Sequence, residues 1–286
     1  MKVGITFYSF HQLLTDGKTT LEECIDFCAR EKVETVDILA YYLKDAHAEI
    51  PGIRRKLESA GLELAAYGVG NNLCLEDAAK RTENVEMIRT GIDVAAQFQA
   101  PLMRVFGGFP DKEQPLERSL SLAVEGLRAV AGHAEKRKVI LALENHGRCP
   151  GTSAETLDVI RRVGSPAIKP LIDTGNFLGA DQQPLDGVRE LAPTCVHVHV
   201  KDYLLTDTYV DSDTFCHRSR TGKTIFRGVR AVGEGSVDLV AAFRILADAG
   251  YSGSLAIEHE GPDPSFEAVA ASIRHTRKCR DAAVRR

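Results

Sequence analysis

The stretch Cys195-Val196-His197-Val198-His199-Val200-Lys201-Asp202 alternates apolar and polar side chains. In an extended strand, alternate residues point to opposite faces, so the three valines share one face while His197, His199 and Lys201 share the other. Such a strand either lies at the surface with its polar face in water, or lines the inside of a barrel whose surrounding helices cover the valines. The eight residues alone do not separate these arrangements, and the rest of the chain decides between them.

Seven further segments have the pattern of short strands, and each strand is followed by a segment with helical spacing of its apolar residues. The expected strands cover residues 3–7, 35–39, 62–67, 102–106, 139–144, 168–173, 195–202 and 254–258. The expected helices begin near residue 20 and cover about 53–60, 76–98 and 115–136, then a helix with Ser153 as its N-cap, 184–191, 239–249 and the end of the chain.

Eight strand–helix pairs without a break in composition predict an α/β protein, a (β/α)8 TIM barrel in a single domain over residues 1–286. An open doubly wound sheet is the competing layout. It usually has a glycine-rich first turn, whereas this chain has Thr6-Phe7-Tyr8-Ser9. The sequence therefore favours the barrel.

A polar segment at about 203–232 follows the seventh strand and is expected to be an insertion. A segment in this place lies over the mouth of the barrel, so we expect it to shape specificity or to act as a lid. Its basic side chains either hold a phosphate or carboxylate or form a solvated loop; they are His217, Arg218, Arg220 and Lys223.

Composition excludes several classes of protein. The chain has 286 residues and a net charge of -4, which gives no general attraction to nucleic acid or to anionic lipid. It contains no apolar run of about 18 residues, as a membrane span would need, and its first residues lack the pattern of a signal peptide. The seven cysteines are scattered, without a CxxC pair, which predicts reduced thiols in a cytoplasmic protein.

Three other expected strands end on a single acid, namely Glu144, Asp173 and Glu258. In a barrel the carboxyl ends of the strands meet at one mouth, where His199 would join them. Carboxylates with one imidazole make a ligand set for one divalent metal: manganese, magnesium, cobalt or zinc. One acid at a strand end is more often a helix cap or a surface residue, but four such residues on strands five to eight make coincidence a weaker explanation.

Several other polar residues have two interpretations. His146 follows strand five and either bonds a substrate hydroxyl or caps local backbone, and Lys201 either pairs with a buried acid or polarises the substrate. Arg104 lies mid-strand, where it either contacts substrate or forms a salt bridge inside the barrel. His197 lies about 7 Å deeper than His199, which favours a core or supporting role. Glu260 is expected at the rim, supporting the site.

Some segments resemble, in order and spacing, the sugar phosphate isomerase/epimerase family, which has a xylose isomerase-like barrel. They are Glu144-Asn145-His146-Gly147, Asp173-Thr174-Gly175-Asn176, the stretch from His197 to Asp202, Gly233-Glu234-Gly235 and Ile257-Glu258-His259-Glu260. The resemblance implies that Glu144, Asp173, His199 and Glu258 bind one divalent metal. It also implies that Glu144 and Glu258 are a proton-transferring pair, that the substrate is a small carbohydrate, and that the chain forms a homo-oligomer.

The chain departs from the ketose 3-epimerase branch of that family at two positions. That branch usually has a histidine where this chain has Asn176, and an arginine where it has Leu205. Both groups touch the sugar in those relatives, so the resemblance implies substrate binding by Asn176 but puts membership of that branch in doubt. The endonuclease branch uses histidines from early strands, and none ends the second or third strand here.

The predicted function is a metal-dependent isomerase or epimerase that acts on a small keto-sugar or keto-polyol through an enediolate, with Glu144 and Glu258 as acid and base. Lys201, His146, Asn176 and Arg104 are the expected substrate-binding residues. A lyase with the same enolate chemistry, which dehydrates, decarboxylates or cleaves its substrate, is the alternative. A non-catalytic sugar-binding barrel is a third hypothesis.

Overall fold

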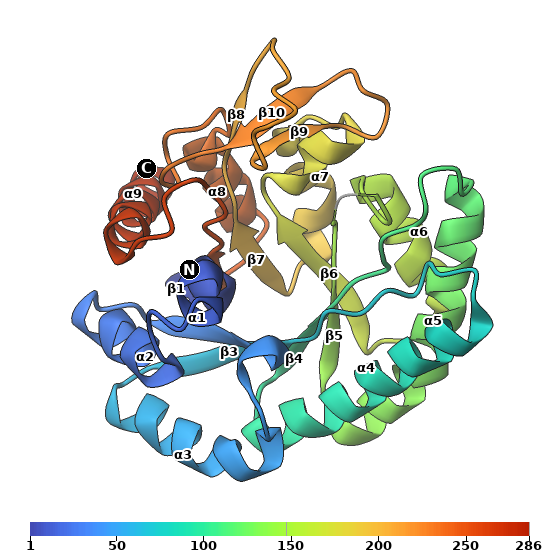
Figure 1. Cartoon of the computed structure of the whole chain (residues 1–286), viewed down its shortest axis with the longest axis horizontal. Coiled ribbons are helices and arrows are strands. Elements are labelled where there is room, and N and C mark those ends of the chain that lie inside the picture. The colour runs from blue at the N-terminus through green and yellow to red at the C-terminus, as the bar shows by residue number, and fades with distance from the viewer. Residues whose placement is uncertain (147, 286) are drawn as a thin grey trace.

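A computed structural model describes residues 1–146 and 148–285 of the chain, and Gly147 of the first motif lies outside the described residues. Eight parallel strands form a closed barrel in the order β1-β11-β7-β6-β5-β4-β3-β2, with helices around it (Figure 1). The predicted TIM barrel is confirmed. Its strands are β1 (Lys2–Thr6), β2 (Thr35–Leu39), β3 (Glu63–Gly68), β4 (Leu102–Val105), β5 (Ile140–Glu144), β6 (Ile168–Asp173), β7 (His197–Val200) and β11 (Ser254–Ile257).

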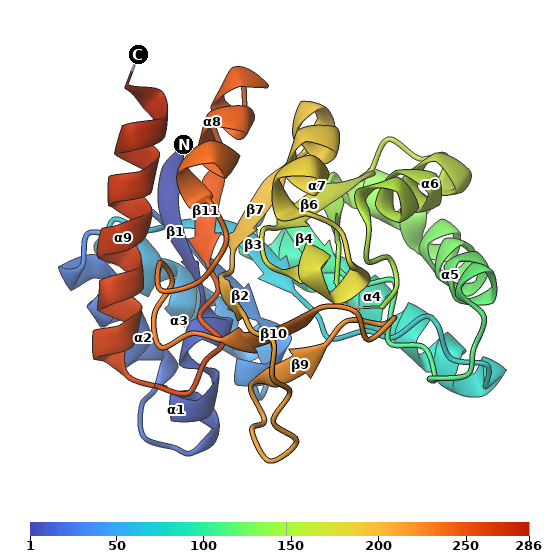
Figure 2. The same ribbon diagram turned by 90° about the horizontal axis from the view of Figure 1, so that it is seen from above.

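The helices that cover the barrel follow the strands along the chain. They are α1 (His11–Thr15), α2 (Leu21–Arg30), α3 (Ala46–Ser59), α4 (Ala78–Phe98), α5 (Leu116–Arg137), α6 (Ser153–Val163), α7 (Pro184–Leu191), α8 (Leu239–Asp248) and α9 (Phe266–Val284). Short 3-10 turns are η1 (Phe7–Phe10), η2 (Ala40–Tyr42), η3 (Asn176–Ala180) and η4 (Ala192–Thr194). Figure 2 shows α9 alongside β1, and β1 also pairs with β11, so the two ends of the chain close the barrel.

Two helix starts differ from the sequence prediction. Helix α3 begins at Ala46 rather than near residue 53, because the Asp45 side chain accepts a hydrogen bond from Ala48 N and the helix continues through Pro51. Ser153 was expected to cap α6 but is its first residue. Thr152 caps this helix instead: its hydroxyl accepts from Glu155 N, and the Glu155 carboxylate accepts from Thr152 N.

The register of the strands brings polar residues together inside the barrel. Asp173 on β6 is paired with His199 on β7, and His199 is in turn paired with Ala256 on β11, two residues before Glu258. Val198 and Val200 belong to the hydrophobic core. Strand β7 is therefore a barrel strand with its polar face turned inward, the second of the two arrangements that its sequence allows.

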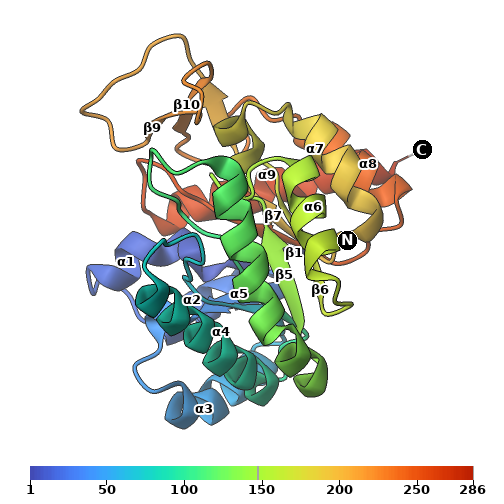
Figure 3. The ribbon, with the colours of Figure 1, turned by 90° about the vertical axis from the view of Figure 1, so that its right-hand side faces the viewer.

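The segment after β7 forms a small antiparallel sheet outside the barrel, of β8 (Tyr203–Leu205), β10 (Ile225–Gly228) and β9 (Cys216–Arg218) in that order. Figure 3 shows β9 and β10 standing apart from the ring of helices. The chain then returns to β7, because the Asp202 carboxylate accepts hydrogen bonds from the backbone N–H groups of Gly233, Gly235 and Val237. A Cβ at residue 235 would lie 2.1 Å from Asp202 Oδ1, so this position requires glycine.

Within the described residues, no helix combines the length and the apolar character that crossing a bilayer requires.

Candidate metal centre

Four predicted site residues converge at the carboxyl ends of neighbouring strands. One ligand atom from each of Glu144, Asp173, His199 and Glu258 lies within 4.8 Å of the other three, and all four residues are buried. Glu144 and Asp173 end β5 and β6, His199 is in β7, and Glu258 directly follows β11. Three carboxylates and one imidazole thus face a single point, a donor set suited to a divalent metal.

Each carboxylate of this centre has one oxygen held by the protein. Asp173 Oδ1 accepts hydrogen bonds from the N–H groups of Gly175 and Asn176, both at 2.9 Å. Glu144 Oε1 accepts one from Asn176 Nδ2 at 3.1 Å, and Glu258 Oε1 lies 2.6 Å from Lys201 Nζ. These contacts fix how the three carboxylates are turned.

The other oxygens are left without a hydrogen bond. Among the described residues, Glu144 Oε2, Asp173 Oδ2, Glu258 Oε2 and His199 Nδ1 are buried polar atoms that have no hydrogen-bond partner. His199 Nδ1 lies 2.9 Å from Glu258 Oε2, which is the distance of an ion pair when the imidazole is protonated. Buried polar atoms are normally hydrogen-bonded, so four possible metal ligands without a hydrogen bond around one point fit a cation that completes their coordination.

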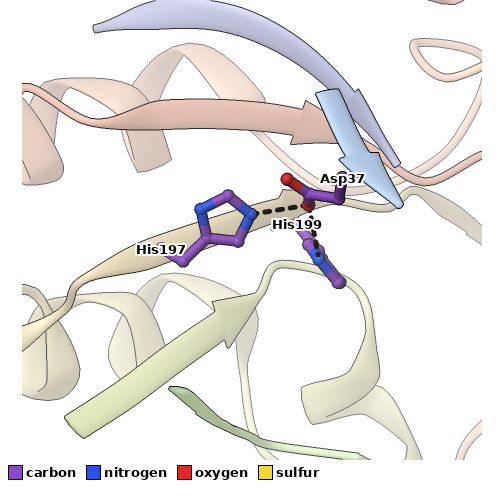
Figure 4. Close-up of side chains that lie close together, drawn as sticks. All are labelled: Asp37, His197 and His199. Carbon is purple, nitrogen blue, oxygen red and sulfur yellow. Dashed lines mark hydrogen bonds and ion pairs between the residues drawn. The ribbon is translucent and has the colours of Figure 1, made fainter. Parts of the chain in front are cut away.

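The imidazole of His199 is oriented from its other nitrogen. Asp37, from β2, places Oδ2 at 3.3 Å from His199 Nε2 and at 2.7 Å from His197 Nε2 (Figure 4). A carboxylate on one nitrogen of a histidine fixes the ring and its tautomer and so directs the other nitrogen at a metal. His197 is buried and supports Asp37 rather than the centre itself, as its depth on the strand predicted.

Lys201 brings a positive charge into the centre. Its ammonium is buried and lies 2.6 Å from Glu258 Oε1, 3.0 Å from Glu260 Oε2 and 3.6 Å from Asp173 Oδ2. Burial lowers the pKa of Lys201, but the carboxylates of Glu258 and Glu260 outweigh burial and hold this pKa well above its ordinary value. Lys201 therefore carries a positive charge among the acids.

Arg104 and His146 complete the wall on the side of β4 and β5. Arg104 Nη1 lies 3.5 Å from Glu144 Oε2, and its guanidinium lies 4.2 Å from the ring centre of Phe106. The centre of the His146 ring lies 4.5 Å from the ring centre of Phe106 and 5.0 Å from that of Phe109. Burial lowers the pKa of His146 to about 3, so this imidazole is neutral and offers one hydrogen-bond donor and one acceptor.

Crowding of the acids changes their ionisation. Burial, together with the nearby Glu258 carboxylate, raises the pKa of Glu144 to about 7 and that of Asp173 to about 6. For Glu258, burial also opposes ionisation, but Lys201 and His199 outweigh burial and hold its pKa well below the ordinary value. A divalent cation among these groups favours the ionised form of every carboxylate that faces it.

The structure thus brings all the sequence-predicted site residues into one region and adds two contacts that the sequence does not predict. The sequence pattern places Asp37 in a strand and assigns it no role. An acid inside the buried strand Thr35-Val36-Asp37-Ile38-Leu39 is nevertheless a signal, since a buried charge needs a partner. The contact of Asn176 with Glu144 was not foreseen, because it depends on the 3-10 turn η3.

A cleft of about 300 Å³ opens beside the centre. His146, Asn176, Lys201 and Glu260 line its inner end, and residues of the β8-β10-β9 sheet, among them His217 and Phe226, line its outer wall. The small sheet therefore lies over the mouth of the barrel. A molecule in this cleft would reach groups that touch the four-residue centre directly.

Comparison with known proteins gives relatives named as inosose dehydratases and a relative named as a D-psicose 3-epimerase. An inosose dehydratase of Clostridium botulinum (strain Eklund 17B / Type B) is 23% identical over 273 residues, which cover 87% of this chain and 85% of that protein. A D-psicose 3-epimerase of Enterocloster bolteae is 24% identical over 219 residues, 70% of each chain. Alignments with further inosose dehydratases span only 52% to 56% of those proteins.

Solved structures agree on the fold. The IolI protein, whose crystal structure holds a zinc atom, superposes with a TM-score of 0.76 at 16% identity and covers 99% of this chain and 98% of that chain. The family model described as "Xylose isomerase-like TIM barrel" matches residues 19–279. The chain therefore belongs to the xylose isomerase-like TIM barrel family.

Proposed function

We propose that this chain is a divalent-metal-dependent isomerase or epimerase that acts on a small keto-sugar or keto-polyol. The observation that carries the proposal is the set of four buried donor atoms without hydrogen bonds, one each from Glu144, Asp173, His199 and Glu258. Relatives named as sugar epimerases and inosose dehydratases point to the same class of substrate.

Glu144, Asp173, His199 and Glu258 would hold the metal. When bound, the metal would polarise the substrate carbonyl and stabilise the negative charge that develops on its oxygen. The oxygen-rich donor set suits manganese, magnesium, cobalt or zinc, and the zinc atom in the related IolI protein supports a divalent ion.

The residues around the centre would divide the remaining work. Glu258 and Glu144 would remove a proton beside the carbonyl and return one, on opposite sides of an enediolate. Lys201 holds the Glu258 carboxylate in place, and Asn176 and Arg104 hold that of Glu144. Neutral His146 faces the cleft, where it would hydrogen-bond a substrate hydroxyl. The same side chains of Lys201, Asn176 and Arg104 would also contact the sugar.

A lyase is the second candidate, and the names of the relatives favour it specifically, because the chain aligns over most of its length with inosose dehydratases. The first step would be the same loss of a proton beside the carbonyl. If the substrate carries a hydroxyl on the carbon beta to the carbonyl, elimination of water would follow instead of reprotonation.

The test is proton exchange in deuterium oxide with magnesium-loaded protein and a panel of ketoses, inososes and 3-keto sugars, followed by proton NMR. Deuterium at the carbon beside the carbonyl, with substrate and isomer both present, is the result expected of an isomerase. Loss of substrate into a dehydrated or cleaved product would assign the lyase. A protein that binds metal but exchanges no proton on any sugar would contradict both.

A Glu258→Gln variant separates the enzymes from a sugar-binding barrel. Glutamine has nearly the same shape as glutamate but cannot accept the proton. Both enzyme candidates therefore require the exchange to fall by a factor of about 100 or more in the variant. Sugar binding without exchange in either protein, measured by calorimetry, would support the binding barrel.

A further inference from the structure

The cleft beside the metal centre has a positively charged outer wall. Arg148, Arg218 and Arg220 line it together with His217. A wider cavity of about 880 Å³ shares these four residues and adds Lys112 and one acid, Asp111, so the two cavities are adjacent. This concentration of cations occurs in a chain whose net charge is -4.

Two of the cations near the cleft already have a carboxylate partner. Lys201 is paired with Glu258 and Glu260 at the inner end. Arg220 donates two hydrogen bonds to Glu155, at 2.6 and 3.0 Å, and so belongs to the framework of the wall.

Arg148 and Arg218 differ from these. Within the part of the chain that the structure describes, neither guanidinium has a carboxylate within 4.0 Å. Arg218 is held in place by stacking, because its guanidinium lies 4.2 Å from the ring centre of Tyr209. Two guanidinium groups without a carboxylate partner therefore line one cleft, and both are exposed, so an anion in the cleft can reach them.

The inner end of the same cleft is made of groups that would recognise a keto-sugar. Asn176 and Lys201 each touch a carboxylate of the metal centre. A sugar bound there through its carbonyl and hydroxyl oxygens would extend its far end toward Arg148 and Arg218. Guanidinium groups bind carboxylate and phosphate oxygens through paired N–H donors, which a neutral hydroxymethyl group would not use fully.

We propose that Arg148 and Arg218 form an oxyanion subsite, so that the substrate is an anionic keto-sugar that carries a carboxylate or a phosphate at the end remote from its carbonyl. This inference rests on the proposed function for the reacting end of the substrate. A carboxylate and a phosphate both present an oxyanion on the sugar chain, and matched substrates distinguish the two groups.

The first test measures binding without turnover, with inorganic phosphate as the probe. The protein is freed of metal with EDTA, so that phosphate cannot bind through a cation. Its thermal unfolding is then followed in rising phosphate against chloride of equal ionic strength. Phosphate also stabilises proteins non-specifically. Each shift in the midpoint of thermal unfolding is therefore compared with the shift in Lys223→Gln, which removes a charge from the same segment but does not line the cleft.

The expected result is a saturable stabilisation by phosphate in the wild type and in Lys223→Gln that is absent from the double variant Arg148→Gln/Arg218→Gln. Equal stabilisation in all three proteins, or no saturation in any, would overturn the subsite. This outcome is independent of whether the protein turns over any sugar, so it separates failure of the subsite from failure of the proposed function.

The second test uses D-fructose, D-fructose 6-phosphate and D-fructuronate as matched substrates for proton exchange. The wild type is expected to exchange one of the two anionic sugars with a higher kcat/KM than D-fructose, and the preferred one identifies phosphate or carboxylate. In the double variant that preference should fall roughly tenfold to a hundredfold, as expected for loss of charge-assisted hydrogen bonds. A wild type that prefers D-fructose, or a double variant with an unchanged preference, would refute the proposal.

Discussion

Asp37 Oδ2 lies 3.3 Å from Nε2 of His199, while Nδ1 of the same ring faces Glu258 and Glu144. The two residues come from β2 and β7, which are not neighbours in the barrel sheet. The contact therefore crosses the interior of the barrel, and it exists only because the barrel is closed. This contact links Asp37, for which the sequence predicts no role, to the proposed metal centre.

Replacement of Asp37 by asparagine should weaken metal binding without removing a ligand. The amide can donate to His199 Nε2, which permits the wrong tautomer and weakens the basicity of Nδ1. We expect the affinity for cobalt or manganese to fall roughly 10- to 100-fold, as for other partners of metal-bound histidines. Calorimetric titration of the metal-free protein measures this.

Asp202→Asn is the matched control for that variant, because Asp202 is also buried but its carboxylate accepts hydrogen bonds from backbone N–H groups outside the centre. We expect it to lower the free energy of unfolding and to leave metal affinity unchanged. Equal metal affinity in Asp37→Asn and the wild type would show that Asp37 does not orient His199.

Lys201→Met should destabilise the metal-free protein more than the metal-loaded protein. Without the ammonium, the carboxylates of Glu258, Glu260 and Asp173 repel one another in a buried site, and loss of one partner from such a cluster costs about 3 kcal/mol. Excess magnesium should restore part of this loss. Urea unfolding with EDTA and with magnesium measures both values.

The control for Lys201 is Lys56→Met, which breaks a more exposed ion pair with Asp26 and should change stability by less than about 1 kcal/mol. If Lys201→Met lowers the free energy of unfolding equally with and without metal, the Lys201 ammonium and the metal ion do not neutralise the same carboxylates.

Gly4→Ala should destabilise the barrel where β1 lies between β11 and β2. A Cβ at residue 4 would lie 2.1 Å from Thr35 Oγ1 and 2.4 Å from Ser254 Oγ, which are hydrogen-bonded to each other at 2.6 Å. We expect a loss of about 1 to 3 kcal/mol in the free energy of unfolding. At Gly132 in α5, a new Cβ would meet no described atom within 4 Å apart from its chain neighbours and the backbone of its own helix, so Gly132→Ala should instead stabilise by roughly 0.5 to 1 kcal/mol.

The Glu155–Arg220 pair should make stability depend on pH in acid. Burial opposes ionisation of Glu155, but Arg220 and the N–H groups of Gly151 and Thr152 outweigh burial and lower its pKa in the folded protein. A lowered folded pKa stabilises the protein above the unfolded value of about 4.3, and this stabilisation is lost as the pH falls through the folded pKa.

Glu155→Gln should therefore be less stable than the wild type at pH 7, and the difference should shrink below about pH 4. Denaturant unfolding at several pH values tests this. Glu117→Gln, which removes a carboxylate that is 75% exposed, should give only a small difference at every pH. A difference for Glu155→Gln that stays constant with pH would contradict the assignment.

The sequence predicted the barrel and the four central residues because both depend on local patterns. Alternation within each strand identifies the inward face, and position at a strand end identifies the mouth. Glu144, Asp173, His199 and Glu258 could therefore be grouped without coordinates. Helix α7 and strands β2 and β6 even have the predicted bounds.

The contacts that the sequence did not predict depend on the closed barrel or on turns. Asp37 contacts His197 and His199 across more than 150 residues of chain, and no periodic pattern in the sequence indicates that contact. The contact of Asn176 with Glu144 needs the turn of η3, and the sheet of β8, β9 and β10 formed in a segment that was expected to be a polar insertion.

The hydrogen bonds between Asp202 and the returning chain have a consequence for protein engineering. Because Asp202 receives the N–H groups of Gly233, Gly235 and Val237, the segment from residue 203 to residue 232 leaves and re-enters the barrel at nearly the same place. A grafted segment of different length or charge could be closed by the same glycines. Substrate selectivity could then be redesigned by exchanging this segment, while the positions of the four central side chains stay unchanged.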